Sequence, residues 1–323
     1  MKRNVPLKSA IFIYVAGLAL GSVLGLVAAI FAEEMSDGAY VFLSYALTQT
    51  GFLVPVVIYA ARRKNEITDI FPLAKPKIKA LPFTILVSIG AFMQNLLPAT
   101  AVETLFGLIG VGSNVNIPDL TDPVNAVLAV LLIAALPAIA EEFLFRGVMA
   151  GAAFKSAYFM MFYSAAVFAV GHLSPVQMVH QFILGAVLVF LVYSTGTVWY
   201  SVLVHFFNNV LALFTVYIPG YAEAVNFSGA GAWVLPVMCI IGIAVLYPAV
   251  NALVKYHKGG RLGGYASSDG IIKTVMKRGG REWYISVAVP EDEARRDNAY
   301  ALGLIVCLAV LTVLNAALGA LGA

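Results

Sequence analysis

Charged residues are scarce in this chain: Asp, Glu, Lys and Arg make up 11% of its 323 residues, and 61% of the residues are hydrophobic. A soluble domain carries about 25% charged residues, so the composition argues against a water-soluble fold. Apolar runs of about 20 residues recur along the chain, and each is long enough to cross a bilayer as a helix. The composition therefore predicts an all-α polytopic membrane protein.

Cysteine is also rare. The two cysteines, Cys239 and Cys307, both lie within apolar runs. Two are too few for a disulfide framework or a cysteine-based metal site, and we expect both side chains to serve in packing, as free cysteines commonly do.

The sequence contains no basic stripe with interleaved aromatic residues, so nucleic acid is not expected as a partner.

Nine apolar segments are interpreted as membrane spans. Their approximate ranges are 9–32, 39–61, 80–101, 124–152, 157–173, 175–195, 197–218, 231–254 and 299–321. The first is longer than the apolar core of a typical signal peptide, so we interpret it as an uncleaved span. We divide the chain into N-terminal spans (1–123), a catalytic helical core (124–218), an eighth span (219–254), a cytoplasmic basic segment (255–298) and a C-terminal span (299–323).

The basic residues predict an orientation. With nine spans, every Lys and Arg outside the helices falls on one side of the membrane, and the segments on the other side carry acidic residues only. Cytoplasmic segments are enriched in Lys and Arg. We therefore predict a multi-pass protein of the plasma membrane with a cytoplasmic N-terminus, and we expect its basic segments to attract anionic membrane lipids.

Within 255–298, two short strands are expected around Gly279–Gly280.

Three charged residues interrupt the apolar stretch "IAEEFLFRG", residues 139–147: Glu141, Glu142 and Arg146. Ionisable residues at membrane depth are costly, and they indicate function by default. Glu142 and Arg146 are four residues apart with the acid first, the favourable order for an ion pair. Glu141 points about 100° away around the helix, and it is our candidate base. The alternative is that all three charges form one buried stabilising network.

The same helix has recognisable local signals. Asp122 followed by Pro123 is typical of a helix N-terminus. Pro137 removes one backbone hydrogen bond, so we expect a kink four residues before Glu141 that opens space beside the two glutamates.

Two histidines and one asparagine complete the candidate site. His172 follows Phe168 by four residues in "FAVGH", and Asn209 follows His205 by four residues in "HFFNN". A lone histidine in an apolar span is often only a packing residue. Two polar side chains on one helix face raise the cost of burial and favour a functional role.

Two reaction designs fit these residues. In the first, Glu141 and His172 activate a water, while His205 and Asn209 stabilise an oxyanion. In the second, Glu141, His172 and His205 bind Zn²⁺, which activates the water. The sequence has no HExxH pair, no GxSxG elbow and no catalytic cysteine setting.

Together the motifs EExxxR, FxxxH and HxxxN resemble those of the CAAX prenyl protease and bacteriocin-processing (CPBP, Abi-type) intramembrane proteases. The resemblance covers about residues 124–215. It implies an eight-helix-type core, here with an additional span, and a polar cavity within the membrane.

For individual residues, the resemblance implies that Glu141 and His172 activate water and that His205 and Asn209 form the oxyanion site. Glu142 and Arg146 would support the architecture. It further implies an endopeptidase without a cofactor, with Zn²⁺ as the alternative, acting on a hydrophobic or lipidated peptide. A non-catalytic membrane regulator or immunity-type binding protein on the same fold is the alternative function, because segment 255–298 and the ninth span lie outside the resemblance.

Overall fold

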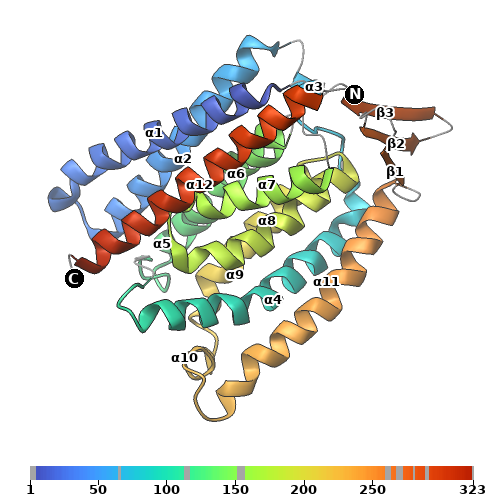
Figure 1. Cartoon of the computed structure of the whole chain (residues 1–323). Helices are drawn as coiled ribbons and strands as arrows, with labels where there is room; N and C mark the ends of the chain where they lie inside the picture. Colours follow the sequence, from blue (N-terminus) through green and yellow to red (C-terminus); the bar gives the residue numbers. More distant parts are fainter. Residues whose placement is uncertain are drawn as a thin grey trace.

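The computed structural model describes residues 5–64, 67–112, 117–150, 157–258, 263–266, 272–278, 281–287 and 291–321. Long helices dominate this part of the chain (Figure 1): α1 (Leu7–Ile30), α2 (Asp37–Arg62), α4 (Leu81–Gly107), α7 (Ala157–Val170), α8 (Pro175–Thr195), α9 (Trp199–Thr215), α11 (Val234–Lys258) and α12 (Glu291–Leu321). A further rod joins four segments end to end: α5 (Pro123–Ala129), η4 (Val130–Ala135), α6 (Leu136–Glu141) and η5 (Glu142–Met149). Short helices lie in the connections: η1 (Ala32–Glu34), α3 (Ile67–Ile70), η3 (Ile78–Ala80), α10 (Tyr221–Val225) and η6 (Gly229–Trp233).

Seven helical segments among the described residues are long and apolar enough to cross a membrane. They correspond to seven of the nine expected spans. The predicted fold class, an all-α polytopic membrane protein, is therefore confirmed.

The two remaining spans, expected at 157–173 and 197–218, are shorter than predicted. Helices α7 and α9 contain 14 and 17 residues, or about 21 and 26 Å, whereas a bilayer core is about 30 Å thick. Helix α7 ends at Val170 because the chain turns sharply before the next helix, with Leu173 at a left-handed φ of 50°. His172 therefore lies just beyond the end of α7, not within a span.

The start of α9 is fixed by the loop that follows α3. Gly196 ends α8 with a left-handed φ of 71°, and the next residue, Thr197, forms a backbone bridge with Leu73. The Val198 N–H then donates to the Pro72 carbonyl at 2.7 Å. These bonds hold residues 197–198 out of the helix, which accounts for the short α9.

The central rod lies among the other helices, with the α1–α2 hairpin on one side and α7, α8 and α9 on the other (Figure 1). Helices α4 and α11 pack side by side beyond α8 and α9, and α12 packs against α1 and α7. The three charged side chains of the rod, Glu141, Glu142 and Arg146, are consequently buried.

Glycines allow α1 and α2 to approach closely. A side chain at Gly51 of α2 would collide with the backbone of Gly21 in α1. Small residues at such crossings let helix backbones pack tightly within membranes. This crossing also sets the position of Gln49, which lies two residues before Gly51.

The central rod begins as the sequence predicts but bends differently. The Asp122 carboxylate accepts hydrogen bonds from the N–H groups of Val124 and Asn125, at 2.8 and 2.9 Å, and Pro123 occupies the first turn. Around Pro137 the rod contains two π-helical segments, η4 and η5, instead of a simple kink. Such wider turns are common at functional sites, and η5 carries Glu142 and Arg146.

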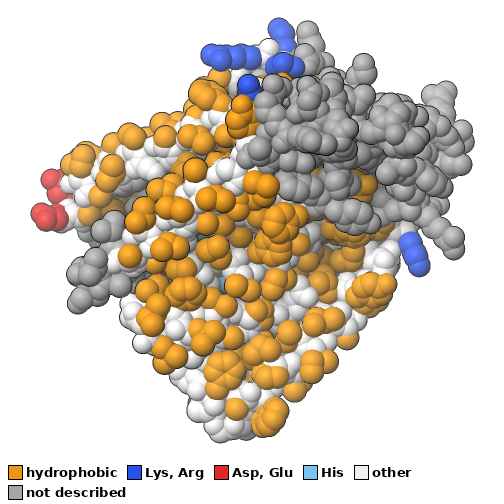
Figure 2. Space-filling view, viewed as in Figure 1, with side chains coloured by type: hydrophobic (Ala, Val, Ile, Leu, Met, Phe, Trp, Pro, Cys, Tyr) orange, Lys and Arg blue, Asp and Glu red, His pale blue; other side chains and the backbone are white. Residues whose placement is uncertain are grey.

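The charged surface residues are segregated along the α1–α2 hairpin. Figure 2 shows Lys and Arg side chains at the end where α2 stops and Asp and Glu side chains at the opposite end, with hydrophobic side chains between. This matches the charge distribution expected of a membrane-spanning bundle. The cytoplasmic placement of the basic end stays a prediction.

The chain segment that connects α11 to α12 contains a small antiparallel sheet. Its strands β1 (Gly263–Ala266), β2 (Ile272–Arg278) and β3 (Arg281–Val287) pair in the order β1-β2-β3. Strands β2 and β3 flank the position where a two-strand hairpin was expected, and the turn at Gly279–Gly280 lies outside the described residues.

Candidate active site

The predicted ion pair between Glu142 and Arg146 is present at the start of η5. The Nη1 atom of Arg146 donates to Oε1 of Glu142 at 2.7 Å, and both side chains are fully buried. A second N–H of Arg146 donates to the Gly185 carbonyl of α8 at 3.2 Å, and the guanidinium lies 4.3 Å from the centre of the Phe168 ring. The pair therefore joins η5 to both α7 and α8.

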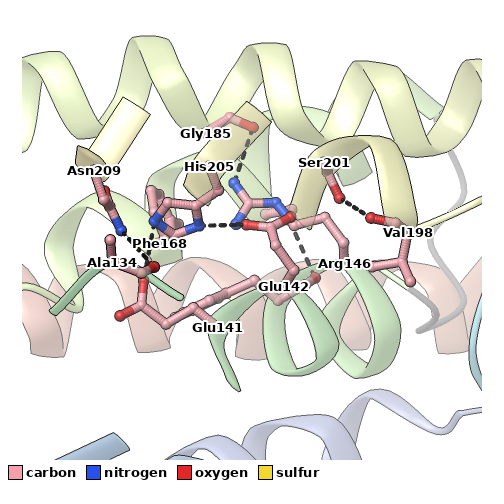
Figure 3. A network of polar contacts seen from close by, with 12 residues as sticks. Ala134, Glu141, Glu142, Arg146, Phe168, Gly185, Val198, Ser201, His205 and Asn209 are labelled. Carbon is pink, nitrogen blue, oxygen red and sulfur yellow. Dashed lines mark hydrogen bonds and ion pairs between the residues drawn. The ribbon is translucent and has the colours of Figure 1, made fainter. Parts of the chain in front are cut away.

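His205 of α9 joins the same carboxylate from the other side, so that Glu142 lies between His205 and Arg146 (Figure 3). Its Nδ1 is 2.9 Å from Oε1 of Glu142, and because an ionised carboxylate only accepts, this nitrogen carries the proton. Its other nitrogen, Nε2, lies 3.9 Å from Oε2 of Glu141. Glu142 thus orients His205 toward Glu141.

His172 is oriented in a similar way by the backbone. Its Nδ1 donates to the Phe168 carbonyl at 2.8 Å, which leaves Nε2 available for another partner. The Phe168 ring contacts both imidazoles edge-on, with ring centres 4.9 Å from His172 and 5.6 Å from His205. The phenylalanine of the FxxxH motif therefore separates the two histidines and also supports Arg146.

Glu141 has a partner that the sequence analysis missed. The Nε2 of Gln49, in α2, donates to Oε1 of Glu141 at 3.0 Å, and both residues are buried. Gln49 lies in the second apolar run, 92 positions before Glu141 and outside the three motifs, so no local pattern in the sequence pairs the two residues. A buried glutamine beside the close Gly21–Gly51 crossing is the signal that points to this contact.

A cavity of about 390 Å³ adjoins Glu141 and His172. Its walls come from α1, α2, the end of α6, η5 and the turn after α7. The polar lining residues near the glutamate are Tyr45, Thr48 and Gln49. The cavity is large enough for several water molecules, and a carboxylate and an imidazole both line it.

The four candidate catalytic residues do not all meet at one point. Glu141, His172 and His205 converge around Phe168, whereas the Nδ2 of Asn209 donates to the Ala134 carbonyl at 3.4 Å. The carbonyl belongs to the π-helical segment η4, which faces α9. Among the described residues, neither Asn209 nor His205 lines the cavity. The expected His205–Asn209 oxyanion pair is therefore not aimed into this space in the structure.

The zinc alternative requires three ligands around one point. The described residues contain no group of three or more His, Cys, Asp or Glu side chains placed to hold one metal ion. We therefore derive no reaction step through a metal.

The fold and the site define a polytopic membrane protein with a buried acid–imidazole site beside an intramembrane cavity. Residues 123–211 match the family model described as type II CAAX prenyl endopeptidase Rce1-like. The match falls on the segment that carries the three motifs, and it confirms their resemblance to the CPBP family over this part of the chain. No curated protein and no solved structure matches the chain.

Proposed function

We propose that the chain is an intramembrane endopeptidase that hydrolyses a peptide bond of a hydrophobic or lipidated, membrane-associated peptide. The observation that carries this proposal is the convergence of Glu141, His172 and His205 from the central rod, the turn after α7 and helix α9, with the first two lining a cavity. The Rce1-like match over the same segment supports it. We retain the plasma membrane and a cytoplasmic N-terminus as the proposed location.

In the proposed reaction, a water in the cavity lies between Glu141 and the free Nε2 of His172. The Glu141 carboxylate takes one proton from this water, and the oxygen attacks the peptide carbonyl carbon. The tetrahedral intermediate then collapses, the C–N bond breaks, and the proton held by Glu141 passes to the leaving amine. The products are one carboxylic acid and one amine.

The developing oxyanion needs N–H donors. His205 supplies one from Nε2 when it carries two protons, because its Nδ1–H remains bound to Glu142. Asn209 has a second hydrogen on Nδ2 besides the one directed at Ala134, and we propose that substrate binding turns this amide toward the site. Glu142 and Arg146 are supporting residues in this scheme, since they hold His205.

The first test is hydrolysis by the purified protein in the presence of a chelator. We expect a hydrophobic peptide to be cleaved at an unchanged rate after exhaustive chelation, and elemental analysis to find no stoichiometric zinc, because no proposed step uses a metal. Loss of activity on chelation with recovery on adding Zn²⁺ would reject the metal-free scheme in favour of the zinc alternative. A well-folded protein that cleaves no peptide under either condition would favour the non-catalytic binding protein.

A second prediction concerns Gln49, which we assign as a positioning residue for Glu141. A hydrogen bond to a charged group contributes about 1.5–3 kcal/mol, so Gln49→Leu is expected to lower kcat by about 10- to 100-fold while KM changes little. Leucine lacks the amide donor and is only one heavy atom smaller than glutamine, so most of the packing at the α1–α2 crossing is kept.

The control for Gln49 is Thr50→Val, on the same helix, whose hydroxyl bonds its own helix backbone at 2.7 Å. This variant should retain kcat within about twofold. If Gln49→Leu changes only the melting temperature, or changes KM and not kcat, the contact is structural and the assignment is wrong.

A further inference from the structure

A second cavity, of about 490 Å³, lies on the α1–α2 hairpin and shares no lining residue with the cavity beside Glu141. Its walls are mostly apolar and come from both helices of the hairpin: Phe12, Ile13, Ala16, Leu20, Val54, Pro55 and Ile58. Several of these side chains are open to the surroundings of the protein, and Phe12 is 74% exposed. In a spanning bundle, this surface faces lipid.

One end of this groove is basic. Lys8, in the first turn of α1, and Arg62, the last residue of α2, both line it. They lie at the same end because the two helices run antiparallel. Figure 2 shows Lys and Arg side chains gathered at this end of the hairpin. Both side chains are exposed, so a ligand can reach them from the membrane surface.

We propose that this groove binds an anionic phospholipid, with the phosphate between Lys8 and Arg62 and one acyl chain along the apolar walls. The dimensions fit one leaflet. From Lys8 to Leu20 the groove follows α1 for about 18 Å, and half of a bilayer core is about 15 Å. Positively charged side chains at the membrane surface attract anionic headgroups, and the apolar walls replace contacts with neighbouring lipids.

A second copy of the chain is a poorer occupant of the groove. Two copies in one membrane share the same orientation, so a two-fold interface through this groove would bring their basic ends to the same level. Lys8 and Arg62 of each copy would then face those of the other, and none of the described residues that line the groove is acidic. The charge of the groove therefore favours a lipid phosphate.

The test is retention of lipid by the full-length purified protein, measured by native mass spectrometry with phosphatidylglycerol and phosphatidylcholine of identical acyl chains. We expect the wild type to prefer phosphatidylglycerol. The double variant Lys8→Gln/Arg62→Gln should bind phosphatidylglycerol about 25-fold more weakly, at about fivefold per cation, with little change for phosphatidylcholine. The matched control Lys75→Gln/Lys79→Gln removes the same charge at the same end of the bundle, outside the groove, and should change neither affinity.

A third variant, Ala16→Phe, fills the apolar part of the groove and should weaken binding of both lipids. Equal binding of the two lipids by the wild type, or equal loss in the groove and control double variants, would overturn the proposal. It would also fail if Ala16→Phe left phosphatidylglycerol binding unchanged, or if the groove variants only shifted a monomer–dimer equilibrium. None of these outcomes depends on proteolytic activity.

Discussion

Replacing Glu141 by glutamine is expected to lower kcat for cleavage of a hydrophobic peptide by about 10²- to 10⁴-fold, the usual contribution of a general base. Glutamine has the same shape, and its carbonyl oxygen can still accept the hydrogen bond from Gln49 that Glu141 accepts at 3.0 Å. The substitution therefore removes the proton acceptor while preserving the packing. Initial rates on a synthetic hydrophobic peptide in detergent or lipid discs measure the effect.

The matched control is Glu103→Gln. Glu103 is an exposed carboxylate near the end of α4 that belongs to none of the three motifs and does not line the cavity, and its replacement should change kcat by less than about twofold. Thermal unfolding of both variants should remain close to that of the wild type. Full activity in Glu141→Gln would remove this residue from the mechanism.

The second large effect is on stability. Arg146→Met is expected to lower the free energy of unfolding by about 3–5 kcal/mol, because it leaves the buried Glu142 carboxylate without its ionic partner. The guanidinium also lies over Phe168 and bonds the Gly185 carbonyl, so the loss reaches α7 and α8. Unfolding in mixed detergent with increasing dodecyl sulfate measures the difference.

The double variant Glu142→Leu/Arg146→Met distinguishes a broken ion pair from lost packing. Removing both charges should restore a large part of the stability lost in Arg146→Met, since no isolated charge remains buried. Lys79→Met, at an exposed position, should have little effect. If Arg146→Met is as stable as the wild type, the Glu142–Arg146 pair does not hold the core together.

The sequence predicted those features that depend on local pattern. The helices follow from long apolar runs, the start of the central rod from Asp122 and Pro123, and the buried ion pair from the four-residue spacing of Glu142 and Arg146. Each of these signals lies within one helix or at its end. The three family motifs then predicted that residues from separate parts of the chain meet in one site.

Other features depend on contacts between distant segments. Gln49 reaches Glu141 across 92 positions, and this contact requires the glycine crossing of α1 and α2. The π-helical segments arise in the packed rod, and no local residue pattern marks them beyond Pro137. Asn209 shares a helix with His205, but the carbonyl of Ala134 takes its hydrogen bond.

The most direct measurement of the central claim is a single-turnover cleavage in ¹⁸O-labelled water, followed by mass spectrometry of the product and of the protein. If Glu141 activates water for direct attack, the new carboxyl group of the peptide carries one ¹⁸O after the first turnover, Glu141 carries none, and Glu141→Gln yields no labelled product at the same time point. Unlabelled first-turnover product with ¹⁸O on Glu141, or undiminished labelled product from Glu141→Gln, would contradict the account.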